Sequence, residues 1–305
     1  MASMSNNEPT YELAVSYAQE KQYDKAIEIY KDLISKNPEA DSLRLALAWT
    51  YRDAGYLGEA ISQFEELLEK ELSRKIFTGF AFDELVRIYT EKRDFKRLIE
   101  VCRKAVQSQP DDLSLLFTLG HSLLKANLPQ EAAEVFEKLC RLESDATLYL
   151  TALGEARIAA GDFDRASECY EQAIALDPEG ADRYFFNLGE AFLKAGAFAR
   201  AETSFIKAIH CKGDCATYYC ALGDACIRQG KLDQADVAYE NACRINPQHR
   251  AAFYNRFGLA LLGAGQSAEA VGVLEKAVSL DPGNPFLQQH LAEARSAAGL
   301  TEKPD

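Results

Sequence analysis

Residues 153–170 read LGEARIAAGDFDRASECY, and the pattern in this stretch recurs along most of the chain. A glycine follows a leucine, and an alanine stands twelve residues after that glycine. The equivalent positions recur at steps of 34 or 35 residues; they are Leu119-Gly120, Leu153-Gly154, Leu188-Gly189, Leu222-Gly223 and Phe257-Gly258, with Ala132, Ala166, Ala201, Ala235 and Ala270. Small residues at a fixed period indicate close packing of helices in a stacked array.

Helical periodicity within each repeat predicts two helices joined by a tight turn. In the quoted repeat, Leu150, Leu153 and Arg157 share one face of a first helix, whereas Ala166 and Tyr170 mark the inner face of a second. The turn between them favours a residue that tolerates positive φ. The residues at this place are Gly55, Gly161, Gly196, Gly230 and Gly265, with Asn127 in the fourth repeat. Prolines end five second helices, because proline cannot continue a helix: Pro38, Pro110, Pro178, Pro247 and Pro282.

The order of small residue, aromatic residue, small residue and proline resembles the tetratricopeptide repeat. The full matches are Ala166-x3-Tyr170-x2-Ala173-x4-Pro178 and Ala235-x3-Tyr239-x2-Ala242-x4-Pro247. The resemblance covers about 278 of the 305 residues. It implies an all-α fold, a right-handed superhelical solenoid of antiparallel helix pairs with about eight repeat units and a C-terminal capping helix. It also implies a concave groove, lined by first helices, that holds peptides or partner proteins.

The repeat frame predicts the domain organisation. The units are 7–40, 41–74, 79–112, 113–146, 147–180, 182–215, 216–249 and 251–284. Residues 1–6 are expected to be a disordered N-terminus or a cloning remnant, residues 285–299 a capping helix, and residues 300–305 a disordered tail.

Two features of the first half depart from the repeat. Residues 75–78 are inserted after a second unit that lacks its closing proline, which predicts a longer helix from about Ala60 through Arg74 and a local change in pitch. The third unit carries Val86, Arg93, Leu98 and Cys102 where small, glycine, alanine and aromatic residues are expected.

Composition narrows the possible partners and compartments. The net charge is -13 without a long Lys/Arg cluster, which argues against nucleic acid as a partner. No apolar run is long enough to cross a membrane, and the first residues lack the basic and apolar regions of a secretion signal. Because a helical chain of 305 residues needs no disulfides, its eight cysteines fit a reducing, cytoplasmic location.

The cysteines and histidines do not form a recognisable catalytic or metal-binding motif. His210, Cys211, Cys215, Cys220 and Cys226 are close in sequence, but no C-x2-C knuckle occurs. The frame places Cys226 on the packed face and Cys220 on the groove side, so we expect no zinc, no other metal and no cofactor. The four histidines lie in different units without a nucleophile motif, so no catalytic residues and no enzymatic activity are expected. Redox sensing by Cys211 or Cys215 stays open.

The groove that the resemblance implies is the expected binding surface. Its register places side chains from the first helices on the inner wall, and the candidates are Trp49, Arg52, Asp83, Arg87, Phe117, His121, Phe186, Asn187, Glu190, Asp224, Arg228 and Asn255. Five of them, Phe186, Asn187, Glu190, Asp224 and Arg228, are expected to form one patch with Phe186 as an aromatic anchor. An ordinary solvated helix face is the alternative for each residue, and Trp49 could instead pack against the third unit.

The sequence therefore predicts a non-catalytic scaffold or adaptor that binds a protein or peptide in its groove. Two alternatives stay open. The chain could be a structural protein that self-assembles through its end units, which makes a homo-oligomer possible, or a regulatory subunit of an enzyme complex. Membrane insertion is not expected.

Overall fold

The computed structural model describes residues 10–300, so the expected disorder of residues 1–6 and of residues 301–305 lies outside the described residues. Between these limits the chain forms seventeen α-helices, two short 3-10 helices and no strand. In chain order they are α1 (Tyr11–Gln19), α2 (Tyr23–Lys36), α3 (Asp41–Asp53), α4 (Leu57–Arg74), α5 (Phe80–Glu91), α6 (Phe95–Ser108), α7 (Leu113–Lys125), α8 (Pro129–Leu142), α9 (Thr147–Ala159), α10 (Phe163–Leu176), η1 (Pro178–Gly180), α11 (Ala181–Lys194), α12 (Phe198–Cys211), α13 (Ala216–Arg228), α14 (Leu232–Ile245), η2 (Pro247–His249), α15 (Arg250–Gly263), α16 (Ser267–Leu280) and α17 (Pro285–Ala297).

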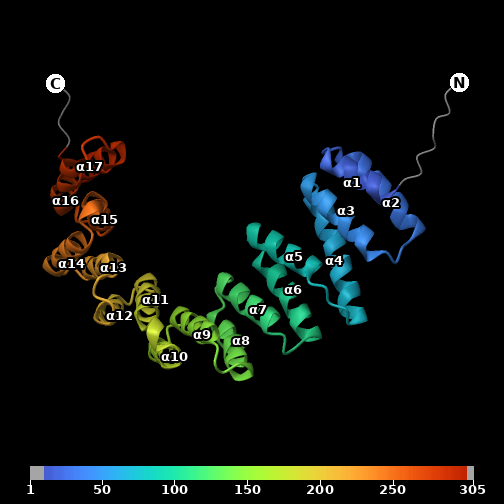
Figure 1. Ribbon diagram of the computed structural model, residues 1–305, viewed down its shortest axis with the longest axis horizontal. Coiled ribbons are helices and arrows are strands. Elements are labelled where there is room, and N and C mark those ends of the chain that lie inside the picture. Colours follow the sequence, from blue (N-terminus) through green and yellow to red (C-terminus); the bar gives the residue numbers. More distant parts are fainter. Residues whose placement is uncertain (1–9, 301–305) are drawn as a thin grey trace. The chain divides into compact units, whose positions relative to one another are not determined.

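The helices form two compact parts, and the boundary between them along the chain falls between Val135 and Phe136. In each part, consecutive helices pack as antiparallel pairs (Figure 1). In the C-terminal part the pairs are α9/α10, α11/α12, α13/α14 and α15/α16, and α17 packs against α15 and α16. The all-α fold of stacked helix pairs is confirmed.

The core of a pair depends on a small residue on the first helix that faces a large residue on the second. A Cβ atom added to Gly154 would lie 2.6 Å from Cε2 of Tyr170, and one added to Gly189 would lie 2.5 Å from Cε1 of Phe205. Both aromatic rings are fully buried. The periodic glycines are therefore required because these rings occupy the space that a side chain would need.

The α5/α6 pair keeps the same construction with the two sizes reversed. Val86 occupies the position of the small residue, and Cys102, sixteen residues later, occupies the position of the aromatic ring. Cys102 is fully buried, as is Leu98, which replaces the periodic alanine. The third unit therefore forms its helix pair despite its departure from the repeat.

The turns and the long helix agree with the sequence prediction. Gly161 and Gly230 have φ values of 82° and 74°, and Asn127 has a φ of 60°. Helix α4 has eighteen residues, whereas α2 and α6 have fourteen. It ends at Lys75, whose φ of 57° is left-handed, and the side chain of Glu71 accepts hydrogen bonds from the backbone and hydroxyl groups of Thr78 in the inserted segment.

Candidate functional site

The first helices of the C-terminal part carry a row of polar side chains, which we call the first-helix face. Its members are Glu155 on α9, Asn187 and Glu190 on α11, Asp224 on α13, and Asn255 and Arg256 on α15. Four of them, Asn187, Glu190, Asp224 and Asn255, belong to the sequence-predicted site. The repeat register places the other two, Glu155 and Arg256, on the same inner side of their helices.

Asp224 lies at the centre of a satisfied polar cluster on this face. Its Oδ2 accepts hydrogen bonds from Nη2 of Arg256 at 2.6 Å and from Nε of Arg256 at 3.1 Å. Its Oδ1 accepts a hydrogen bond from the hydroxyl group of Tyr239, whose side chain is fully buried. Burial and the neighbouring Asp224 carboxylate raise the pKa of Tyr239, so the hydroxyl group remains a donor at neutral pH.

Glu155 has a different environment, two helix pairs earlier. Among the described residues its carboxylate makes no ion pair and no hydrogen bond. Glu155 is exposed at the surface, but desolvation of its carboxylate by the surrounding protein raises its pKa, and the positive charge of Lys194 opposes this shift. The hydroxyl group of the fully buried Tyr170 also lacks a hydrogen-bond partner, although buried polar atoms are nearly always paired. Its ring lies beside Gly154, the residue that precedes Glu155.

The five residues expected to form one patch do not share one role. Phe186 is not a free anchor, because its ring packs against Tyr218 and Phe205 at centroid distances of 5.0 and 5.7 Å. The guanidinium group of Arg228 lies 5.0 Å from the ring centroid of Phe198, at the start of α12. Only Asn187 and Glu190 present side chains without these packing or pairing contacts. The half-buried ring of Phe186 contributes to the core, and its role as an aromatic anchor stays a prediction.

Asn255 connects two helices near the C-terminal end. Its Oδ1 lies 2.8 Å from Nδ1 of His290 on α17. The capping helix therefore shares a polar contact with the first-helix face.

The candidates in the N-terminal part form a network of charges with one another. Nη1 of Arg52 lies 2.6 Å from Glu84, which also accepts a hydrogen bond from Arg87 at 2.7 Å. Arg87 pairs with Glu91 as well, at 3.1 Å. Glu84 was not predicted from the sequence, although its place between two arginines on neighbouring helices could have indicated it. Partial burial and the charge of Glu84 raise the pKa of Asp83.

The aromatic candidates of this part also make local contacts. Trp49 meets Phe80 edge-on at a centroid distance of 6.3 Å, so it packs against the third unit as the alternative interpretation proposed. Phe117 meets His121 edge-on at 4.4 Å. Burial, aided by the charge of Lys125, lowers the pKa of His121.

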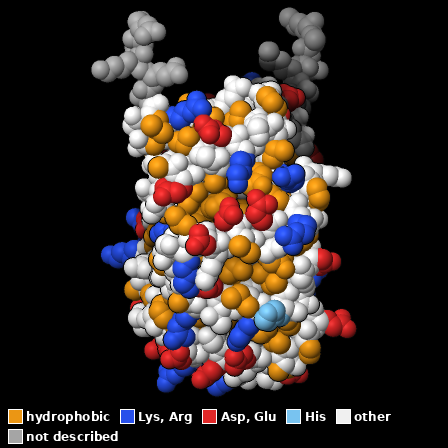
Figure 2. All heavy atoms as spheres, turned by 90° about the vertical axis from the view of Figure 1, so that its left-hand side faces the viewer, with side chains coloured by type: hydrophobic (Ala, Val, Ile, Leu, Met, Phe, Trp, Pro, Cys, Tyr) orange, Lys and Arg blue, Asp and Glu red, His pale blue; other side chains and the backbone are white. Residues whose placement is uncertain are grey.

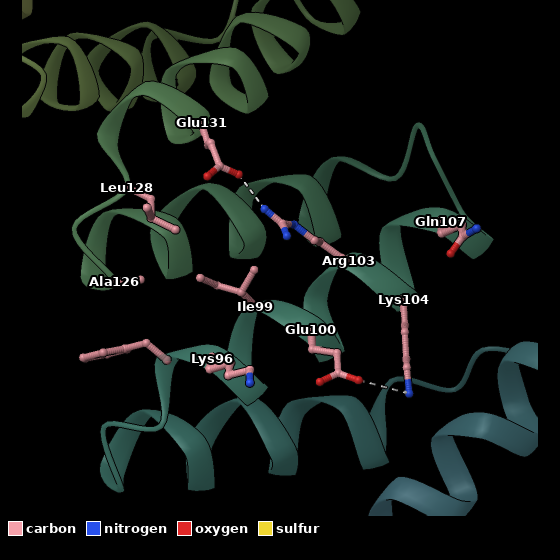
Figure 3. Close-up of a pocket in the computed structure, with 10 residues that line it drawn as sticks. Lys96, Ile99, Glu100, Arg103, Lys104, Gln107, Ala126, Leu128 and Glu131 are labelled. Atoms are coloured by element: carbon pink, nitrogen blue, oxygen red, sulfur yellow. Dashed lines mark hydrogen bonds and ion pairs between the residues drawn. The ribbon is translucent and has the colours of Figure 1, made fainter.

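Hollows of the surface lie along the second helices, where none of the sequence-predicted residues is found. One of about 640 Å³ lies between α6 and the start of α8, with an apolar floor that includes Ile99 and Leu128 (Figure 3). Arg103 and Glu131 form an ion pair of 2.5 Å across it. The sequence prediction confined the binding surface to the first helices and therefore missed this hollow.

A second hollow, of about 480 Å³, lies between α12 and α14 and includes Ile206 and Val237. Val237 is 61% exposed, which is high for an apolar side chain. Figure 2 shows that hydrophobic side chains gather among charged ones on the side of the C-terminal part where α14 and α16 lie. This surface is the alternative to the first-helix face as a binding surface.

The cysteine cluster does not present its thiols together. Cys211 is exposed and Cys215 is half-buried, whereas Cys220 and Cys226 are each 1% exposed. The expected position of Cys220 on the groove side is wrong, because its thiol packs in the core, where burial raises its pKa to about 12. No group of three or more potential metal ligands occurs between residues 10 and 300. Over the same range, no helix is long and apolar enough to cross a bilayer.

Comparisons with known proteins agree with this architecture. The tetratricopeptide repeat matches residues 17–74, 151–214, 216–249 and 251–284. Human protein O-mannosyl-transferase TMTC1 is 27% identical over 173 residues, which are 55% of this chain and 19% of that protein. The Hsp70-Hsp90 organizing protein of Triticum aestivum is 31% identical over 147 residues, 48% of this chain and 19% of that protein. The chain thus spans about a fifth of the length of these two relatives.

Among solved structures, a tetratricopeptide repeat protein from Parabacteroides merdae has 16% identity and a TM-score of 0.48. The match covers 82% of this chain and 96% of that one.

Proposed function

The chain belongs to the tetratricopeptide repeat family, and from this premise we propose that it is a non-catalytic scaffold that binds a segment of another protein on its first-helix face. Tetratricopeptide repeat proteins generally mediate interactions between proteins, and a relative named as an organizing protein fits this role. The residues that bear chemistry support binding rather than catalysis, because the first-helix face holds no nucleophile paired with a base.

One observation carries the choice of surface. The buried hydroxyl group of Tyr170 has no partner, and it lies beside the unpaired carboxylate of Glu155. Burying a polar group without a hydrogen bond costs about 1–3 kcal/mol. A bound segment that supplies the missing hydrogen bonds would recover part of that cost. The apolar hollow at Ile206 and Val237 has no comparable unsatisfied group.

A capture experiment with charge-matched variants tests the proposal. The intact protein is used to capture partners from native lysate, beside a first-helix variant with Glu155→Lys and Glu190→Lys. The matched control carries Glu168→Lys and Glu171→Lys on the exposed side of α10, so its net charge changes equally. Glu240 on α14 is unsuitable as a control because it accepts a hydrogen bond from Tyr254 at 2.7 Å.

We expect the first-helix variant to lose partners that the α10 variant retains, with circular dichroism showing both to be folded. Loss confined to the α10 variant, or to a third variant with Ile206→Ser and Val237→Ser, would place recognition on the second helices. The mass of the purified chain as a function of concentration separates this scaffold from a self-assembling one.

A further inference from the structure

Two layers of the C-terminal part carry equivalent residues in the same register. In the layer of α13, α14 and α15 these are Asp224, Tyr239 and Arg256. The layer of α9, α10 and α11 has Glu155, Tyr170 and Asn187 at the corresponding positions. In both layers the tyrosine follows the acid by 15 residues, and the third residue follows the acid by 32.

The tyrosine rings occupy equivalent places, so their hydroxyl groups are also equivalent. A Cβ atom added to Gly223 would lie 2.6 Å from Cε2 of Tyr239, the same distance as between Gly154 and Cε2 of Tyr170. Each glycine directly precedes the acidic residue of its layer. Each tyrosine hydroxyl is therefore directed toward the acid that follows its glycine, and the Glu155 charge raises the pKa of Tyr170 after the larger effect of burial.

The two layers differ in the presence of a cation. In the α13–α15 layer, the guanidinium group of Arg256 donates two hydrogen bonds to the carboxylate that also accepts the tyrosine hydroxyl. In the α9–α11 layer, the exposed Asn187 stands where Arg256 would stand, and both Glu155 and Tyr170 lack partners. The charge of Lys194 opposes the rise in the pKa of Glu155, but Lys194 forms no ion pair with this residue.

We propose that an arginine side chain of the bound segment occupies the position beside Asn187 and completes the α9–α11 layer, as Arg256 completes the α13–α15 layer. This inference rests on the proposed function and names the chemistry of its ligand. A guanidinium group carries five N–H donors in one plane, so it can donate to the Glu155 carboxylate as Arg256 donates to Asp224. The tyrosine hydroxyl can then donate to the carboxylate.

Charge on the surrounding face favours a cation over an anion. Glu190 on α11 also lacks an ion pair among the described residues, and Lys194 forms none with the Glu155 carboxylate. A segment with an acidic side chain at this position would bring like charges together.

Small probes test this assignment on the full chain. N-acetyl-arginine amide and the matched N-acetyl-citrulline amide, which has nearly the same shape without the charge, are titrated while NMR follows the backbone amides of Gly154, Glu155 and Tyr170. We expect saturable shifts with the arginine probe, and apparent affinity reduced roughly tenfold by Glu155→Gln. Equal shifts with both probes, or shifts that Glu155→Gln leaves unchanged, would overturn the proposal.

A second variant supplies the missing cation from within the chain. Asn187→Arg should raise the midpoint of thermal unfolding relative to Asn187→Gln and should abolish the response to the arginine probe. If Asn187→Arg melts no higher than Asn187→Gln and leaves the response to the probe unchanged, a guanidinium group does not occupy the position beside Asn187, and the assignment fails. Should that occur while the capture experiment still depends on Glu155 and Glu190, the proposed function stands and only the arginine assignment fails.

Discussion

The α13–α15 and α9–α11 layers have the same packing, but the acidic residue is paired with an arginine in the first layer only. In both, a buried tyrosine ring fills the space beside a glycine, and an acidic residue follows that glycine. Arg256 satisfies the acid of one layer, whereas Asn187 leaves the acid of the other unpaired. Packing is therefore repeated because the fold requires it, while the polar residues beside it can vary, and we propose that these residues provide recognition.

The largest expected effect tests what the two layers share. Gly154→Leu and Gly223→Leu should each lower the free energy of unfolding by about 3 kcal/mol. Even the Cβ atom of the new side chain would lie only 2.6 Å from the ring of a fully buried tyrosine. Denaturant titration of both variants measures this loss. Equal losses support equivalent packing, and an unaltered midpoint in either variant would disprove it for that layer.

Helix α11, which belongs to the α9–α11 layer, provides the next test. Phe186→Ala should lower the free energy of unfolding by about 2 kcal/mol. This loss is smaller than that for removing a fully buried aromatic ring, because Phe186 is half-buried against Tyr218 and Phe205. Exposed Asn187→Ala serves as the control and should stay within about 0.5 kcal/mol of the wild type. If Phe186→Ala is as stable as that control, Phe186 is a free anchor after all.

Removing the acidic charges tests how the layers differ. Asp224→Asn should destabilise the chain by roughly 1–2 kcal/mol, because it weakens hydrogen bonds from Arg256 and Tyr239. Glu155→Gln removes no existing hydrogen bond, and we expect a change within about 0.5 kcal/mol. Thermal unfolding of the two variants measures the difference. A larger loss for Glu155→Gln would mean that its site is already satisfied.

The smallest effect concerns pH. The raised pKa of Glu155 means that the folded state binds this proton more readily than the unfolded state does. The residue therefore contributes stability at pH values below the unfolded pKa, and this contribution is lost as pH rises through the raised folded pKa. The stability of the wild type relative to Glu155→Gln should fall over that window.

Glu84 provides a control of opposite sign. Its partial burial acts to raise its pKa, but hydrogen bonds from Arg87 and Arg52 outweigh this and lower it. Its contribution should be lost as pH falls through the lowered folded pKa. If Glu155 shows the dependence expected of Glu84, its carboxylate is paired in solution.

Much of the fold was predictable because backbone turns and close approaches require particular residues. The glycines at the turns, the prolines after second helices and the glycines beside aromatic rings each have one physical reason that sequence displays directly. Lys21 and Arg93 adopt φ values of 60° and 55° at the turns of the first and third units, so the turn geometry does not strictly require glycine. The spacing of the repeats predicts these two turns although neither has a glycine.

The site was less predictable because register alone does not show what a side chain contacts. Phe186 and Cys220 occupy inward positions of the frame, yet both pack against buried neighbours contributed by other helices. Their contacts depend on how adjacent pairs stack, which a single repeat does not encode. The charges at Glu155 and Arg256 could be placed from the frame, but the missing partner of Tyr170 required the structure.

Site-specific photo-crosslinking tests most directly whether the first-helix face recognises the partner. A benzophenone amino acid is placed at Asn187 in one variant and at Val237, in the hollow between α12 and α14, in another. Each variant is irradiated in native lysate after its folding is verified. The expected result is a discrete crosslinked protein from position 187, lost when Glu155 and Glu190 are changed to lysine, with none from position 237. A crosslinked protein from position 237 alone would contradict the account.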